Sequence, residues 1–166
     1  MKTLVAYSTL TGNTKKVAEE IGKAIANSEV FDIADVKELD YDLIVVGSWI
    51  DKGTADKKSM DFIKTLSNKK VAFFFTLGAY ADSDHAKKSS DAIKELFLEN
   101  NNEIIGQYYC QGAIDPKLME QMRKMFPTDH PHAVNPEREA RWKAASTHPD
   151  AQDLKNAYDY FKNLLG

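Results

Sequence analysis

The chain has 166 residues, of which 43% are hydrophobic and 28% charged, with a net charge of −3 and one cysteine. A chain of this length forms one domain with a sizeable core, and the composition is that of a globular protein rather than a disordered or membrane-spanning one. The weak charge offers no basic surface to nucleic acid, and one cysteine excludes an internal disulfide and a cysteine-built metal cluster. Because the sequence begins without a long apolar segment, we expect no membrane partner and a cytoplasmic location.

Apolar runs alternate with helical patterns along the chain. Residues 3–7, 43–47 and 71–75 are continuous apolar runs, which are typical of parallel strands buried on both faces. Residues 30–36 alternate more weakly and predict an edge strand, and residues 103–110, which include Cys110, predict a fifth and buried strand. The alternation predicts an α/β fold with a parallel sheet and right-handed crossovers.

The segment between the first predicted strand and the first predicted helix is rich in hydroxyl groups: Ser8-Thr9-Leu10-Thr11-Gly12-Asn13-Thr14. A helix N-terminus presents unpaired N–H groups and a partial positive charge, so such a loop can close around a phosphate. The hydroxyls can donate hydrogen bonds, the glycine allows a tight turn, and the asparagine can tie the loop to itself. The alternative is an ordinary strand-to-helix connection with a Ser/Thr cap.

This loop resembles the phosphate-binding loop of the flavodoxins, a (Ser/Thr)-x-Thr-Gly-Asn-Thr run between the first strand and the first helix. The resemblance implies FMN as the cofactor. It also implies a flavodoxin-like three-layer sandwich, with a five-stranded parallel sheet in the order 2-1-3-4-5 and the ligand between strands one and three. The loops after Tyr7, Gly47 and Phe75 are therefore expected to surround the cofactor.

The loop after the third strand is expected to hold one side of the flavin ring. Ser48 and Trp49 end this strand, and flavodoxins place a tryptophan or another residue there, which implies that Trp49 stacks on the ring rather than plugging the core. The backbone of Ile50-Asp51-Lys52 is expected near the flavin N5 atom. Many members of the family have a glycine there, whose peptide can flip toward the reduced ring, whereas here the first glycine is Gly53, which lies further along the chain. A flip at Ile50-Asp51 is expected to strain the backbone, because β-branched residues disfavour positive φ.

The loop after the fourth strand resembles the family's contact to the pyrimidine end of the ring. Thr76, Leu77 and Gly78 match that loop and offer backbone donors and acceptors. Tyr80 is predicted either to cover the outer face of the ring or to lie at the surface.

Lysines near these loops distinguish the chain from a typical flavodoxin. Flavodoxins are usually acidic around FMN, and a negative field disfavours the fully reduced, anionic flavin. Lys52, Lys57 and Lys58 stand here instead, so we expect full reduction to be easier and the partner or substrate to be acidic.

A minimal flavodoxin lacks the helical insertion predicted at residues 113–149, before a C-terminal amphipathic helix. Apolar residues at 118–126 predict one helix, and Asn135-Pro136-Glu137 predicts the start of another. Because the fifth strand ends at the ligand edge, the insertion is expected near the flavin as a lid or docking surface. Its methionines are predicted to lie in the core rather than on a partner surface.

The insertion also carries histidines and an aspartate: Asp129, His130, His132 and His148. Proline between two of the histidines leaves no fixed scaffold for a metal, so no metal site is predicted. A histidine that donates a proton to a substrate is the more plausible role for this group.

The whole chain is similar to the small flavodoxin-domain proteins of anaerobic bacteria, some of which accompany bilirubin reductase. This resemblance implies an electron carrier that takes electrons from a reductase and passes them to a partner enzyme, with no catalytic side chain. The alternative is an FMN-dependent oxidoreductase that directly reduces a small conjugated substrate, such as a quinone or an anionic tetrapyrrole like bilirubin. A flavin-free interaction domain is a third reading, because fold does not fix function.

Overall fold

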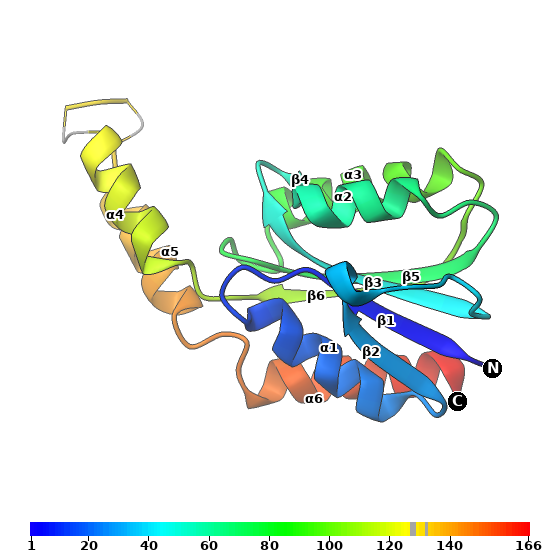
Figure 1. Cartoon of the computed structure of the whole chain (residues 1–166). Coiled ribbons are helices and arrows are strands. Elements are labelled where there is room, and N and C mark those ends of the chain that lie inside the picture. Colours follow the sequence, from blue (N-terminus) through cyan, green and yellow to red (C-terminus); the bar gives the residue numbers. More distant parts are fainter. Residues whose placement is uncertain (127–128, 132) are drawn as a thin grey trace.

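Five parallel strands run through the centre of the computed structural model, which describes residues 1–126, 129–131 and 133–166 (Figure 1). They follow the order β2-β1-β3-β5-β6, and a two-residue strand, β4, pairs antiparallel with β3. Without β4, this is the predicted flavodoxin-like order, which is confirmed. The strands are β1 (Thr3–Tyr7), β2 (Ser28–Asp32), β3 (Leu43–Asp51), β4 (Thr54–Ala55), β5 (Lys70–Leu77) and β6 (Glu103–Gln111).

Helices cover both faces of the sheet. The helices α2 (Lys57–Lys64) and α3 (Asp84–Leu98) lie on one face, and α1 (Asn13–Ala24) and α6 (Ala151–Leu165) lie on the other (Figure 1). Successive side chains of a strand point to opposite faces, so Phe73 and Phe75 join one buried cluster while Phe74 joins the second. Both clusters are apolar, which explains why the central strands are continuous hydrophobic runs.

Two segments differ from their sequence-based boundaries. The edge strand β2 ends at Asp32 rather than at residue 36, because the Asp32 side chain accepts a hydrogen bond from Ala34 N (2.9 Å) and starts the short 3₁₀ helix η1 (Ile33–Asp35). The loop predicted after Trp49 is instead a β-hairpin. Strand β3 continues to Asp51 and returns as β4 through a two-residue turn, in which Lys52 and Gly53 have φ angles of 52° and 81°.

The predicted insertion contains two helices, α4 (Pro116–Met125) and α5 (Pro136–Ala145). They project beyond the edge at which the parallel strands end, and we call residues 113–149 the arm (Figure 1). Arg123 joins the two helices, since it forms an ion pair with Glu139 (3.2 Å) and lies over the Trp142 ring (5.5 Å). The extra helices between the fifth strand and the last helix are therefore confirmed.

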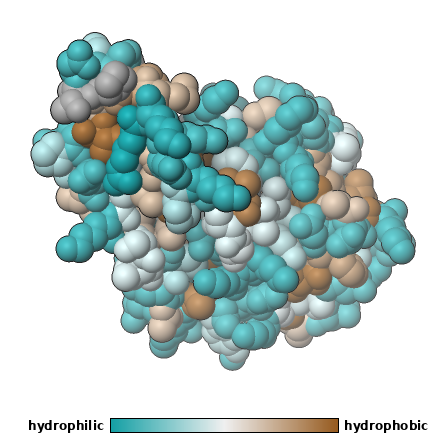
Figure 2. All heavy atoms as spheres, turned by 60° about the vertical axis from the view of Figure 1, so that its left-hand side comes forward, coloured by the Kyte–Doolittle hydropathy of each residue, from teal (hydrophilic) through white to brown (hydrophobic). Residues whose placement is uncertain are grey.

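The methionines of the arm do not lie in the core, so that prediction is wrong. Met125 is 68% exposed, and no residue of α4 is fully buried. Figure 2, in which the side that bears the arm is turned forward, shows apolar atoms at the surface of the arm. The prediction failed because α4 stands outside the sandwich, where only one side of the helix is covered.

Within the described ranges, no helix combines the length and the apolar character that crossing a lipid bilayer requires.

Candidate functional site

A cavity lies at the carboxyl edge of the sheet, among four segments of the chain. The 8–14 loop, the β3–β4 hairpin and the loop after β5 supply three of its walls, and the start of the arm supplies the fourth. The three loops that the sequence placed around one cofactor are therefore neighbours. The lining residues that the sequence predicted as cofactor contacts are Thr9, Leu10, Thr11, Asn13, Thr14, Trp49, Ile50, Asp51, Lys52, Thr76, Leu77 and Gly78.

The start of α1 has the features of a phosphate site. Gly12 is its N-cap residue in a left-handed conformation (φ 96°), with no side-chain cap and no acidic residue in the first turn. Each of the other five α-helices in the described residues has an Asp, Ser or Asn side chain as its cap. No capping side chain therefore accepts a hydrogen bond from the first N–H groups of α1. These N–H donors fit a phosphate dianion.

The side chains of the 8–14 loop have more specific roles than their hydroxyl content suggested. Thr9 Oγ1 accepts a hydrogen bond from Gly12 N (3.0 Å) and shapes the turn. Thr14 is buried, and its Oγ1 lies 3.0 Å from Thr76 Oγ1, so it joins two of the cavity loops. Ser8 and Ser48 are buried and do not line the cavity.

Asn13 links the loop to the arm. Its Nδ2 lies 3.3 Å from Thr11 Oγ1, as the sequence predicted, and it also donates to the carbonyl of Ala113 at 2.9 Å. The second hydrogen bond spans the distance from the candidate phosphate loop to the first residue of the arm. The sequence did not indicate this link, because nothing local relates the two segments.

Trp49 is half-buried in the cavity wall and does not belong to either core cluster. The buried residue Asp56 holds its backbone on both sides: Asp56 Oδ1 accepts from Trp49 N (3.2 Å), and Asp56 N donates to Trp49 O (3.0 Å). Asp56 also caps α2 through Ser59 N. Sequence reasoning missed this positioning residue, although an aspartate directly before a helical pattern is a recognisable N-cap.

The cavity is less basic than the lysine pairs suggested. Lys52 lines it, but Asp51 and Asp115 line it as well. Lys57 forms an exposed ion pair with Asp61 (2.8 Å), and this lysine lowers the pKa of the Asp61 carboxyl. Of the three lysines expected near the cofactor, Lys52 is the one among the described lining residues, and two aspartates line the cavity with it.

The loop after β5 and the arm complete the cavity. Tyr80 is 43% exposed and does not line the cavity, so the structure lends no support to a stacking role for it. Sequence reasoning missed the residues that the arm and its root contribute, although it placed the arm near the ligand edge. They are Gly112, Ala113, Ile114, Asp115 and Leu118.

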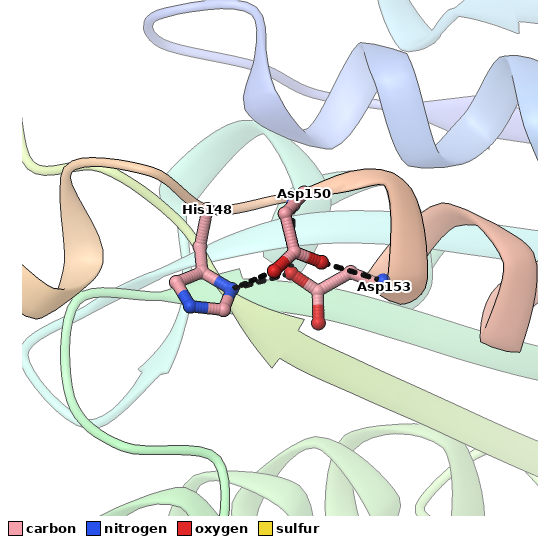
Figure 3. A group of neighbouring side chains, drawn as sticks. All are labelled: His148, Asp150 and Asp153. Carbon is pink, nitrogen blue, oxygen red and sulfur yellow. Dashed lines mark hydrogen bonds and ion pairs between the residues drawn. The ribbon is translucent and has the colours of Figure 1, made fainter.

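A second polar group lies where the arm rejoins the body. His148, Asp150 and Asp153 converge at the start of α6 (Figure 3). His148 Nδ1 lies 2.5 Å from Asp153 Oδ2, and Asp150 and Asp153 each accept the other's backbone N–H at 2.9 Å. The hydrogen bond from Asp153 N lowers the pKa of the Asp150 carboxyl.

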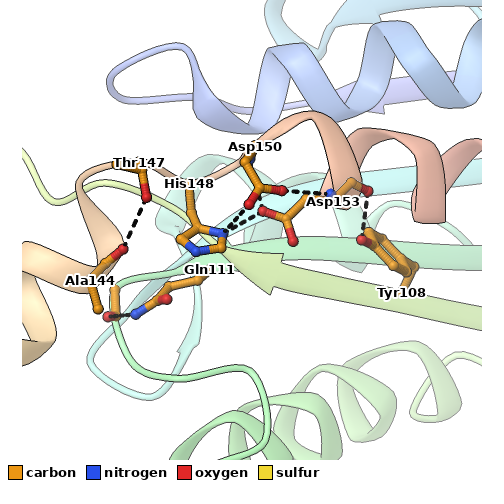
Figure 4. Close-up of polar contacts among 8 residues, drawn as sticks. Tyr108, Gln111, Ala144, Thr147, His148, Asp150 and Asp153 are labelled. Carbon is orange, nitrogen blue, oxygen red and sulfur yellow. Dashed lines mark hydrogen bonds and ion pairs between the residues drawn. The ribbon is translucent and has the colours of Figure 1, made fainter.

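These contacts give the second group a structural role. The atoms of His148, Asp150 and Asp153 that could bind a metal ion lie within 4.8 Å of one another. Most of these atoms are already engaged in capping α6. Tyr108, which donates to the Asp153 carbonyl (2.7 Å), anchors the same turn to β6 (Figure 4). The group thus fastens the end of the arm to the body.

His130 is the other arm histidine that the structure describes. The His130 ring centroid lies 4.9 Å from that of Phe126, and His130 does not line the cavity. His132 lies outside the described residues. The proton-donor role predicted for a histidine of this segment therefore receives no support from His130 or His148.

Comparison with known proteins agrees with the fold. The flavodoxin-like domain-containing protein BilS of Clostridioides difficile is 34% identical over 173 residues, which cover 99% of this chain and 97% of that protein. The oxidised flavodoxin 1 of Bacillus cereus has the same fold, with a TM-score of 0.61, 17% identity and coverage of 99% of this chain and 97% of that one.

A second solved structure contains the cofactor. A flavoprotein of Lactobacillus acidophilus in complex with FMN has a TM-score of 0.50 and 26% identity, and the match covers 66% of this chain and 93% of that one. Residues 4–162 match the flavodoxin domain family, whose cofactor is FMN. The chain belongs to the flavodoxin domain family.

Proposed function

We propose that the chain carries electrons from a reductase to a partner enzyme through FMN bound in the cavity described above. The observation that carries this proposal is that the uncapped start of α1 opens into the same cavity as Trp49 and Gly78. A phosphate donor set, an aromatic side chain and a backbone loop at the polar end of the ring are what the three parts of FMN require.

Each segment of the cavity wall binds a different part of FMN. The 8–14 loop and the first turn of α1 bind the phosphate, and Trp49 packs against the ring. The backbone of residues 76–78 bonds the polar pyrimidine end, and Ile50, Asp51 and Lys52 lie along the ring edge. The bound flavin supplies the capacity to accept and donate electrons, while these side chains orient it and exclude water from its faces.

The composition of the cavity favours a carrier over an independent catalyst. Direct reduction of a conjugated substrate requires a positioned proton donor. Among the described lining residues, those with a carboxylate or amine side chain are Asp51, Lys52 and Asp115. Asp115 accepts a hydrogen bond from Lys117 N (2.9 Å) as the cap of α4, so its carboxylate is committed to the arm.

Purification followed by two measurements tests the proposal. We expect the protein to show the absorption spectrum of bound FMN at about one flavin per chain. With a flavin reductase and NADPH, the holoprotein should pass electrons to cytochrome c. Without the reductase, the reduction of cytochrome c should be negligible. Rapid turnover of NAD(P)H and a quinone or tetrapyrrole by the protein alone would instead identify an oxidoreductase, and a chain that binds no FMN would refute both functions.

A further inference from the structure

We propose that Ile114 and Leu118, at the base of the arm, contact the flavin ring from the arm side of the cavity and position it there. This assignment rests on the FMN site proposed above. It gives the arm a binding role, in which two aliphatic side chains replace the aromatic cover that the sequence suggested for Tyr80.

The first observation concerns the place of the two side chains. Both line the same cavity as Trp49. A Cβ added to Gly78 would lie 2.6 Å from Cγ1 and 2.6 Å from Cδ1 of Ile114, so the end of the Ile114 side chain rests directly on the proposed pyrimidine loop. Leu118 is 44% exposed, and an apolar side chain at a cavity mouth gains free energy when a ring covers it.

The second observation is that hydrogen bonds hold the root of the arm to the ligand loops. Gly112 N donates to Leu77 O (2.8 Å), and Asn13 Nδ2 donates to Ala113 O (2.9 Å). Ala113 N in turn donates to His148 O (2.8 Å), which ties the two ends of the arm together. Ile114 directly follows these anchored residues, so its position over the cavity is fixed from both the phosphate side and the ring side.

The third observation is a hydrogen bond that holds the loop carrying Gly78 to the end of β6. Gln111 Nε2 donates to the carbonyl of Gly78 at 3.1 Å, and Figure 4 shows Gln111 reaching from the end of β6 beneath His148. The loop that carries Gly78 is thus joined to the chain just before Ile114 by two hydrogen bonds, from Gln111 and from Gly112. Trp49 is the one aromatic residue among the described lining residues, so the large apolar side chains that the arm contributes, Ile114 and Leu118, are aliphatic.

Flavin titrations of alanine variants test the assignment. Ile114→Ala should raise the Kd for FMN about tenfold, which corresponds to losing the burial of about two methylene groups against the ring. Leu118→Ala should raise it by about three- to tenfold. Because the contact is to the ring, the Kd for riboflavin should rise by the same factor, and the absorption band of bound FMN should shift toward that of FMN in water.

Two matched variants control for general loss of stability. Ile104 is a half-buried isoleucine at the opposite end of β6, and Leu98 is an exposed leucine at the end of α3. Ile104→Ala and Leu98→Ala should leave both Kd values within twofold of those of the original chain. Circular dichroism of each variant establishes that it is folded, and Ile114→Val provides a milder change with a smaller rise in Kd.

Gly78→Ala gives an independent test of the contact. The new methyl group displaces the Ile114 side chain, so this variant should weaken binding of both flavins. Adding Ile114→Ala removes the collision, and the double variant should bind no more weakly than Ile114→Ala alone.

The outcomes separate this inference from the function on which it rests. Unchanged Kd values for both flavins in Ile114→Ala and Leu118→Ala would overturn it, while FMN binding by the original chain would leave the carrier function standing. A loss for FMN but not for riboflavin would also overturn it, because it would place the effect at the phosphate. Absence of FMN binding by the original chain would refute the proposed function itself.

Discussion

At the scale of single residues, the site depends on side chains that hold other groups in place. Asp56 fixes the backbone of Trp49 at two points, and Thr14 joins Thr76 across the base of the cavity. Buried polar groups with satisfied hydrogen bonds specify one arrangement, because leaving either partner unpaired costs about 1–3 kcal/mol. The loops around the cavity are therefore preorganised for a ligand.

Trp49 should account for a measurable share of the flavin affinity. Trp49→Ala removes an aromatic face, and we expect the Kd for FMN to rise about tenfold or more, since aromatic pairs contribute about 0.5–1.5 kcal/mol beyond area burial. Trp142, in the arm, is the matched control. In Trp142→Phe, the remaining emission, from Trp49, should be quenched by FMN more strongly than the emission of Trp142 is in Trp49→Phe. Equal quenching in the two variants would argue against Trp49 as the ring contact.

The buried thiol of Cys110 should make the folded protein less stable at alkaline pH. Burial raises the pKa of its thiol to about 12, against about 8.5 in an unfolded chain. Between these values the folded state holds a proton that the unfolded state releases, so this contribution is fully present below about pH 8.5 and falls as the pH rises, by at most about 1.4 kcal/mol per pH unit. Burial also raises the pKa of Tyr108, which acts in the same direction at higher pH.

Urea unfolding of the flavin-free protein under reducing conditions measures this effect. The free energy of unfolding should fall between about pH 8.5 and about pH 10, where an ordinary tyrosine is still mostly protonated. Cys110→Ala should show a smaller fall over the same interval, whatever its stability at neutral pH. The same slope in both proteins would mean that Cys110 is not the group responsible.

At the scale of elements, the parts that the sequence predicted are those whose signal is local. Residues 43–47 and 71–75 are apolar without interruption, and this pattern is sufficient to identify strands covered on both faces. The β3–β4 hairpin was missed because β4 has two residues and because a lysine occupies a turn position with positive φ. Turn signals rely on Asn-Gly or Asp-Gly, neither of which stands there.

The candidate site was predictable to the same extent. Parallel strands bring the loops after β1, β3 and β5 to one edge, so three walls of the cavity followed from the fold class. The arm was expected near this edge, but its individual lining residues did not follow, because the position of Ile114 depends on the Asn13–Ala113 hydrogen bond between residues that are 100 positions apart. Such contacts leave no periodicity in the sequence.

The β3–β4 turn makes a prediction about stability. Gly53 has a φ of 81°, which L-residues with a Cβ rarely adopt, so Gly53→Ala should lower the free energy of unfolding by about 1 kcal/mol. Lys52 has a φ of 52°, and Lys52→Asn should leave stability unchanged or raise it slightly, because asparagine tolerates this conformation. Urea unfolding of the flavin-free variants measures both effects. A Gly53→Ala variant as stable as the original chain would contradict the turn geometry.

At the scale of the whole molecule, the protein combines a well-packed sandwich with a thinly packed arm. The strands carry side chains that are almost fully buried, among them Phe73, Phe74 and Phe75. Helix α4, by contrast, buries no residue completely, and its ten residues are too few to form a stable helix alone. Helix α4 therefore depends on its contacts with α5 and on the hydrogen bonds at the root of the arm.

Hydrogen exchange should reveal this difference. Backbone amides of α4 should exchange through local opening well before those of β3 and β5, which require global unfolding, because opening free energy follows buried contact. FMN should slow exchange at the root of the arm and in α4 if the arm contacts the ring. Asn13→Ala, which removes the bond to Ala113, should speed exchange in the arm and leave β5 unchanged, with Asn156→Ala on the exposed face of α6 as the control. Amides of α4 as slow as those of β5 would show that the arm is instead an integral part of the core.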